Sequence, residues 1–235
     1  MKLAVCSDFH LGRRDNTDRF GHDIGHFHAY LDHLEETSDQ VILLGDILDT
    51  HHGRIPLAFF REVRIISDLY AGLVDRLLGG KMRVVSGNHD SCLSQLPGVT
   101  EEALFESDGR RILLMHGHQF DRLIRTSPTL CAIGNYLGGA AERRGFSGAL
   151  AFLDWIDDAA NGGVKVDRNL LYRTKAVELA LRRQVETIVL GHTHQQDCHS
   201  ARGVTYLNVG ANLAGRFEYG FIDTKSGAVE ARTWG

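Results

Sequence analysis

Five short apolar segments of this sequence end in side chains that can bind a metal ion or transfer a proton. The residues at these ends are Asp8-Phe9-His10, Gly45-Asp46, Gly87-Asn88-His89-Asp90, His116-Gly117-His118 and Gly191-His192-Thr193-His194. Strands buried in parallel sheets are near-continuous apolar runs, and ligands bind just beyond their carboxyl ends. Because carboxylates and imidazoles are metal ligands, the pattern predicts one metal centre at these ends.

In the first half of the chain, strand segments alternate with helical segments, and this order indicates how these residues are positioned. Strands are expected at 3–7, 41–44 and 83–86, and apolar residues recur at helical spacing over 24–34. Pro56 favours the start of a second helix, which should run to Leu78 and end at Gly79-Gly80. This β-α-β-α-β order predicts parallel strands with right-handed crossovers.

The second half is expected to contain a hairpin, a helical segment and a set of short strands. An Asp108-Gly109 turn should join the two strands of the hairpin, 99–106 and 111–115. After a strand at 187–190, four short strands separated by turns should form an antiparallel second sheet, at 195–201, 204–209, 216–223 and 228–233.

Residues 121–185 differ in character from the rest of the chain. Their apolar residues have helical spacing, and they contain ten Lys or Arg against seven Asp or Glu, whereas the remaining residues contain 16 against 23. A basic helical segment on an acidic body is suited to a cap that receives an anionic substrate. The alternative is a helical layer with a solvated face, in which the last helix, 167–183, is the crossover to strand 187–190.

The composition excludes several classes of protein. The 235 residues are 43% hydrophobic and 24% charged, with a formal net charge of −4, which argues against a nucleic-acid binder. An apolar stretch of the ~20 residues needed to span a membrane is missing, and the N-terminus lacks a signal-peptide pattern, so a cytoplasmic protein is expected. The four cysteines have neither disulfide-like nor CxxC spacing.

The chemistry best suited to such a centre is hydrolysis of a phosphate ester. That reaction needs a nucleophile at neutral pH and neutralisation of charge on the phosphoryl oxygens. Two divalent ions ~3.5–4 Å apart provide both. A bridging carboxylate with further imidazoles and carboxylates suits Mn, Fe or Zn, and we expect two ions, with Mn as the first choice.

In order and spacing, the five blocks resemble the calcineurin-like metallophosphoesterases. The motifs that carry the resemblance are Asp8-x-His10, Gly45-Asp46-x-x-Asp49, Gly87-Asn88-His89-Asp90, His116 and Gly191-His192-x-His194. The resemblance implies a four-layer α/β/β/α sandwich of two mixed sheets. Together with the helical character of residues 121–185, the resemblance predicts a core of residues 1–120 and 186–235 and a helical cap of residues 121–185.

The resemblance also assigns roles to the residues of the site. One ion would be held by Asp8, His10, Asp46 and His194, and the second by Asp46, Asn88, His116 and His192. His89 would protonate the leaving oxygen or stabilise its charge, with Asp90 orienting the ring. The implied mechanism is in-line attack on phosphorus by a metal-bridging hydroxide, without a covalent intermediate.

Within the family, the sequence is most similar to the branch of the UDP-2,3-diacylglucosamine hydrolases, which cleave a pyrophosphate under a helical lid. The similarity lies in residues 116–121, the helical segment and residues 191–194. Two positions depart from that branch: His89 stands where those enzymes usually have arginine, and Ala211 stands where aspartate is frequent. The substrate implied is a small phosphate compound, including a UDP-2,3-diacylglucosamine-like lipid, with membrane contact through the cap.

Residues outside the metal centre are predicted to contact the substrate or to support the site. Substrate contacts are predicted for Arg13, His118, Arg168 and Lys175. Asp49 is expected to contact the metal ligands without binding an ion itself. His51, His52 and His199 are expected to be solvated or in turns. The apolar cap residues either line a lipid groove or pack the cap on itself; they are Leu150, Phe152, Leu153, Trp155 and Ile156.

Other interpretations stay open at this point. Any single Asp or Asn here could be a cap of a helix or turn, although the complete set favours a metal centre. A nuclease or cyclic-nucleotide phosphodiesterase could use the same site, and a nuclease should show a long basic track. A protein phosphatase would need an open groove, and a non-catalytic scaffold should have lost ligands. The complete ligand set and His89 favour an enzyme.

Overall fold

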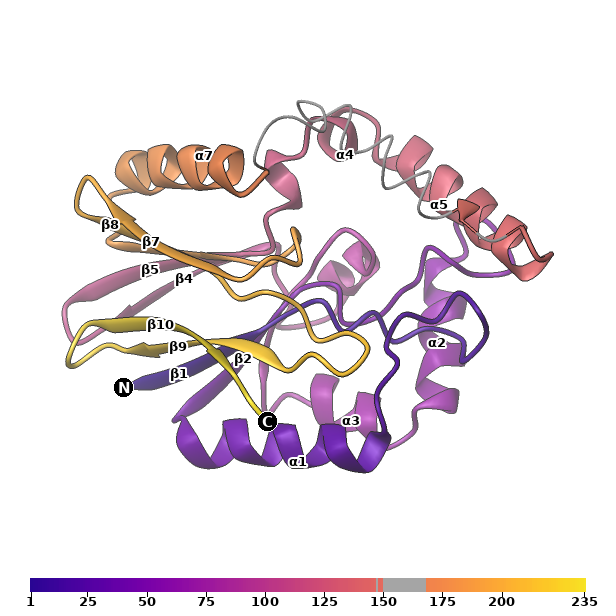
Figure 1. The fold of residues 1–235 in the computed structure, drawn as a ribbon, viewed down its shortest axis with the longest axis horizontal. Coiled ribbons are helices and arrows are strands. Elements are labelled where there is room, and N and C mark those ends of the chain that lie inside the picture. The colour runs from indigo at the N-terminus through magenta and orange to yellow at the C-terminus, as the bar shows by residue number, and fades with distance from the viewer. Residues whose placement is uncertain (147, 150–167) are drawn as a thin grey trace.

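Two five-stranded mixed sheets form the centre of the computed structural model, which describes residues 1–146, 148–149 and 168–235. The first sheet has the order β10-β9-β1-β2-β3 and the second β4-β5-β6-β8-β7. The two sheets pack on each other, with helices on both outer faces (Figure 1). The predicted four-layer α/β/β/α sandwich is confirmed.

The first sheet is parallel where the sequence predicted it to be. Strand β1 (Lys2–Cys6) pairs in parallel with β2 (Gln40–Leu44), which pairs in parallel with β3 (Arg83–Val85). On the other side of β1, β9 (Glu218–Asp223) and β10 (Ala228–Thr233) add two antiparallel strands.

In the second sheet, three parallel strands lie between two antiparallel ones. The hairpin of β4 (Glu102–Ser107) and β5 (Arg110–Met115) is present, and β5 pairs in parallel with β6 (Thr187–Leu190). Next come β8 (Val204–Asn208), parallel to β6, and β7 (Asp197–Ala201), antiparallel to β8. The expectation of a separate antiparallel C-terminal sheet was therefore wrong, because its strands are divided between the two sheets.

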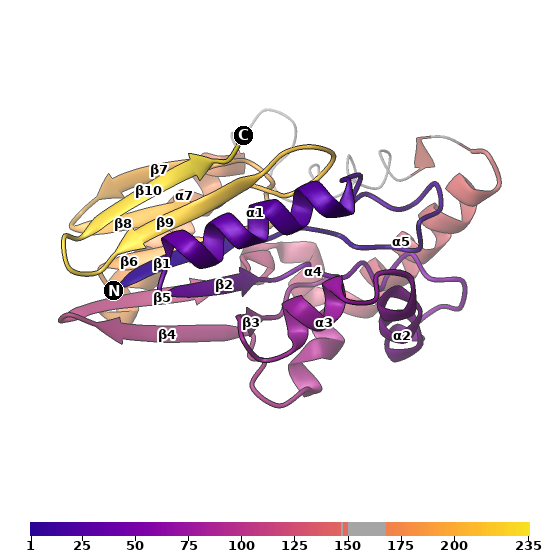
Figure 2. The ribbon, with the colours of Figure 1, turned by 90° about the horizontal axis from the view of Figure 1, so that it is seen from below.

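Apolar side chains form three layers that hold the sheets and helices together. Between the sheets, Val5 and Leu44 of the first pack with Leu114 and Val189 of the second. Below the first sheet lie α1 (Ile24–Thr37) and α3 (Leu73–Leu78), and Figure 2 shows α1 running along this face. Helix α2 (Phe59–Leu69) stands beyond the carboxyl ends of the strands (Figure 1). Above the second sheet lies α7 (Arg168–Arg183).

The long helix expected over 56–78 is two helices. Gly72, with φ of 81°, interrupts it between α2 and α3, in a conformation that glycine adopts without a steric cost. The first of the two begins at Phe59 rather than at Pro56, after a turn in which Leu57 also has a positive φ of 59°.

Beyond the carboxyl ends of the strands lie η2 (His118–Phe120) and two described helices of the predicted cap. These two helices are α4 (Arg122–Thr126) and α5 (Pro128–Arg143) (Figure 1). On the core side, η1 (Ser91–Gln95) follows the loop after β3. The apolar cap residues Leu150, Phe152, Leu153, Trp155 and Ile156 lie outside the described residues.

The helix that the sequence left as either cap or crossover packs on the core. Tyr172, Ala176 and Ala180 of α7 are fully buried against the second sheet. The division into a core of 1–120 and 186–235 and a cap of 121–185 stays a prediction. None of the helices that the structure describes is long and apolar enough to cross a membrane.

Candidate metal centre

The polar residues of the five motifs converge where the parallel strands end. Main-chain hydrogen bonds join the first two loops: Asp8 N donates to Gly45 O at 3.1 Å, and His10 N donates to Asp46 O at 3.0 Å. Asp8, His10, Asp46, His192 and His194 all have positive φ, between 48° and 67°. Such a conformation is uncommon for residues other than glycine and clusters at functional sites.

Two glycines allow the loops to approach closely. A Cβ at Gly87 would lie 2.1 Å from Asp46 Oδ1, and one at Gly45 would lie 2.6 Å from His116 Nδ1. Real Cβ atoms do not approach other atoms so closely, so neither position can carry a side chain without moving a residue of the site.

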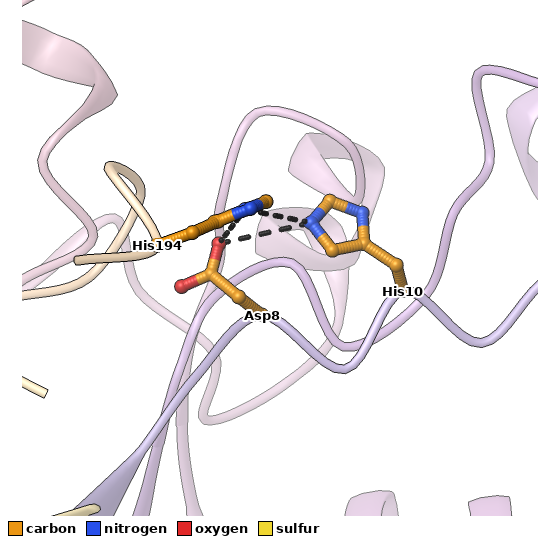
Figure 3. A group of neighbouring side chains, drawn as sticks. All are labelled: Asp8, His10 and His194. Atoms are coloured by element: carbon orange, nitrogen blue, oxygen red, sulfur yellow. Dashed lines mark hydrogen bonds and ion pairs between the residues drawn. The ribbon is translucent and has the colours of Figure 1, made fainter. Parts of the chain in front are cut away.

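One group of candidate ligands consists of Asp8, His10 and His194, which point toward one another in Figure 3. His194 Nε2 lies 3.1 Å from Asp8 Oδ1 and 3.3 Å from His10 Nε2. Asp46 Oδ2 is 3.7 Å from His10 Nε2, so Asp46 borders this group. The four residues are those that the resemblance assigned to the first ion.

The second group consists of Asp46, His116 and His192. His116 Nε2 lies 3.2 Å from Asp46 Oδ2, and His116 Nδ1 lies 2.7 Å from the carbonyl oxygen of Leu44. A proton on Nδ1 can be donated to that carbonyl, which leaves Nε2 to bind an ion. Asp46 belongs to this group and lies 3.7 Å from His10 of the first, so its carboxylate lies between the two groups.

Asn88 provides a test of whether these residues fit a metal. Its side-chain oxygen is buried and has no hydrogen-bond partner among the described residues, an arrangement that is costly unless a cation or water binds there. The complete set of carboxylate oxygens, imidazole nitrogens and one amide oxygen suits Mn, Fe or Zn. The residues therefore fit divalent metal ions.

The pKa values of the buried acidic and histidine residues also favour a cation-binding site. Burial raises the pKa of Asp8 and Asp46, but neighbouring histidines outweigh burial and hold both pKa values well below the usual range. Burial lowers the pKa of His116, but Asp46 and Asp8 outweigh it and raise that pKa to about 10. Buried carboxylates that stay ionised require positive charge close by, which bound cations supply.

The carboxylate beside the ring of His89 is that of Asp49. His89 Nδ1 lies 3.1 Å from Asp49 Oδ1, and His89 N donates to Asp46 Oδ1 at 2.8 Å. Burial lowers the pKa of His89, but Asp46 and Asp49 outweigh it and raise the pKa to about 9. The two carboxylates therefore favour the protonated ring.

The carboxylate of Asp90, which was expected to orient the His89 ring, contacts main-chain N–H groups among the hydrogen bonds described. Its carboxylate accepts hydrogen bonds from the main-chain N–H of Gly87 at 2.7 Å and of Ile47 at 2.7 Å. Burial and the charge of Asp46 raise its pKa to about 6. Asp90 thus joins the loops after β2 and β3, whereas Asp49 contacts the His89 ring.

His51 and His52 lie in a turn, one of the two expected alternatives, but they are buried, whereas His199 is exposed. The ring of His51 lies 4.8 Å from that of His89, centroid to centroid, and Asn135 Nδ2 is 3.2 Å from His51 Nδ1. His52 Nδ1 lies 2.6 Å from Asp49 Oδ2. They are buried because α5 of the predicted cap covers this loop.

The four predicted substrate contacts have different surroundings. His118 lies beside the site, with its ring 5.6 Å from that of His116; burial and the neighbouring His116 lower its pKa to about 3. Arg13 pairs with the buried Glu62 through two hydrogen bonds of 2.7 and 2.8 Å. Lys175 Nζ donates to the carbonyl of Phe120 at 2.8 Å. Arg168 begins α7, and its side chain is not described.

A family model of the calcineurin-like phosphoesterase superfamily domain matches residues 1–142, which is more than half of the chain. No curated protein matches the chain. Among solved structures, Yfce, a phosphoesterase from E. coli, is 17% identical with a TM-score of 0.44, covering 99% of this chain and 98% of its own.

Two further structures are similar at the same level. Vps29 complexed with Zn from Entamoeba histolytica is 14% identical with a TM-score of 0.47, covering 100% of this chain and 98% of its own. A novel archaeal phosphodiesterase is 15% identical with a TM-score of 0.46, and both chains are covered completely. On the match of the family model, this chain belongs to the calcineurin-like phosphoesterase superfamily.

Proposed function

We propose that this chain is a hydrolase with two divalent metal ions that cleaves a phosphodiester or pyrophosphate bond. The observation that carries the proposal is that two groups of largely buried ligands meet at the carboxylate of Asp46, which belongs to one group and lies 3.7 Å from His10 of the other. Membership of the phosphoesterase superfamily supports the reaction class.

The ligand sets follow from the two groups. Asp8, His10, Asp46 and His194 would hold one ion, and Asp46, Asn88, His116 and His192 would hold the other. Two bound ions would lower the pKa of a water ligand and neutralise the charge of the phosphoryl oxygens. Imidazole and carboxylate ligands suit manganese, which we take as the first choice.

His89 is the proposed general acid. Asp49 contacts its Nδ1 and favours the protonated ring, so the ring can give a proton to the leaving oxygen from its other nitrogen. Asp90 supports this arrangement indirectly, because its hydrogen bonds to Gly87 and Ile47 hold the loops that carry His89 and Asp46.

More specifically, we propose that the substrate is a nucleoside-diphosphate lipid, such as a UDP-sugar with acyl chains. The chain would hydrolyse its pyrophosphate bond in the cytoplasm. This proposal is supported by the sequence similarity of residues 116–121 and 191–194 to the UDP-2,3-diacylglucosamine hydrolases. Exposed apolar side chains on the predicted cap also support it: Leu130, Leu137 and Phe146 are 68%, 59% and 69% exposed. These could contact acyl chains or a membrane surface.

The test is hydrolysis by Mn-loaded protein of a phosphomonoester, a phosphodiester, and a UDP-sugar with and without acyl chains. We expect the diester or the pyrophosphate to be cleaved faster than the monoester. Turnover restricted to the acylated UDP-sugar would support the lipid substrate, and preference for a nucleotide diester would exclude it. If none of the four is hydrolysed, the chain is not the enzyme proposed, and a scaffold becomes the better interpretation.

A further inference from the structure

Asp121 is a fully buried carboxylate at the point where the chain leaves the core and begins α4. Its Oδ1 accepts hydrogen bonds from the main-chain N–H of Leu123 at 2.9 Å and of Ile124 at 3.1 Å. It is therefore the N-cap of α4. Capping occupies one oxygen and does not require burial, and aspartates are rarely buried completely unless they are paired.

The other oxygen of Asp121 lies beside a candidate metal ligand. Asp121 Oδ2 is 3.8 Å from His192 Nε2, a distance of electrostatic contact that is too long for a hydrogen bond. His192 belongs to the group formed with Asp46 and His116. With Nε2 facing a carboxylate, the ring would present Nδ1 to an ion in the proposed metal centre.

Further contacts fix the loop of His192, its ring and the chain just before Asp121. Its main-chain N–H donates to Asp8 Oδ2 at 3.1 Å, which anchors the loop to the first group of ligands. The ring of Tyr172, on α7, lies 5.9 Å from the imidazole at an angle of 35°. Lys175, also on α7, holds the carbonyl of Phe120, the residue before Asp121.

We propose that Asp121 is a positioning residue for His192 and couples the start of the cap to the metal centre. The inference rests on the metal centre of the proposed function. A histidine that binds a metal commonly presents its second nitrogen to a carboxylate, which fixes the tautomer and the ring orientation. Here the same carboxylate caps α4, so one side chain orders the first turn of the cap and orients the ligand.

The test compares two N-cap aspartates in the full-length chain. Asp121→Asn keeps an oxygen for capping but loses the negative charge beside His192. Asp23→Asn is the matched control, because Asp23 caps α1 by accepting from His26 N at 2.9 Å and belongs to neither group of ligands. Asn and Asp cap helices about equally well, so metal-free variants should unfold at similar temperatures.

Metal affinity is measured by calorimetric titration of the metal-free proteins with Mn²⁺, and the site is characterised by visible absorption after loading with Co²⁺. We expect two sites in the wild type and in Asp23→Asn. In Asp121→Asn one site should bind ~10–100-fold more weakly, with a changed Co²⁺ spectrum. Asp121→Ser, which can cap but is too short to reach His192, should weaken the same site.

Wild-type affinity at both sites in Asp121→Asn or Asp121→Ser would overturn the proposal. So would lowered thermal stability of these variants without a selective loss of affinity, because Asp121 would then only cap α4. A wild-type chain that binds no divalent ion contradicts both this inference and the proposed function. One that binds two ions but hydrolyses no phosphoester contradicts only the proposed function.

Discussion

His89 is the residue whose role can be separated most cleanly from metal binding, because neither of its proposed tasks requires it to be a ligand. Replacement of His89 by Ala should leave two ions per chain, measured by elemental analysis. Turnover of an alkyl diester should fall ~10²–10⁴-fold, the usual contribution of a general acid. With a p-nitrophenyl ester the loss should be smaller, since that leaving group needs no proton. Equal losses with both substrates would show that His89 acts otherwise.

Helix α5 is the element that connects the predicted cap to the loop beside His89. Arg143 donates to the carbonyls of His52 at 2.7 Å and Gly53 at 2.8 Å, whereas its neighbour Arg144 donates only within α5, to Ala140 O, among the hydrogen bonds described. Arg143→Met should therefore increase amide hydrogen exchange in α5 and in residues 50–53. Arg144→Met is the matched control and should leave both protected. Unchanged exchange in Arg143→Met would mean that α5 is held by other contacts.

At the scale of the whole molecule, the proposed metal centre should contribute to stability. Its five loops follow strands of both sheets, so a bound ion would hold the two sheets together. An ion that binds only the folded chain, at 100 times its Kd, stabilises by about 2.7 kcal/mol. For a chain of this size that is roughly 5–10 °C in Tm. We expect Mn²⁺ to raise Tm by this amount and EDTA to reverse it, as measured by scanning calorimetry.

Asp46→Ala provides the control for that measurement, because Asp46 belongs to one group of ligands and lies 3.7 Å from His10 of the other. The variant should bind neither ion at micromolar concentration, and its Tm should not respond to Mn²⁺. Asp46→Asn keeps an acceptor for the main-chain N–H of His89, so it separates loss of the charge from loss of that hydrogen bond. A metal-dependent rise in Tm for Asp46→Ala would mean that the ions bind elsewhere.

The sequence by itself determined the residues that meet in the site and the parallel core that brings them together. These signals are local: an apolar run followed by Asp, Asn or His marks the end of a buried strand. Parallel neighbours then bring such ends to one edge. Asp8, Asp46, His116 and His194 could be placed in this way, because each directly follows or closely follows a strand.

Only the tertiary structure decided which carboxylate contacts His89, which sheet receives each C-terminal strand, and why His51 and Asp121 are buried. The physical reason is that these outcomes depend on partners distant in sequence. Asp90 is adjacent to His89 along the chain, yet Asp49 lies against its ring, because hydrogen bonds hold the loops after β2 and β3 together. The burial of a polar residue leaves no hydrophobic pattern in the sequence. His51 is contacted by Asn135, 84 residues later, and Asp121 faces His192, 71 residues later.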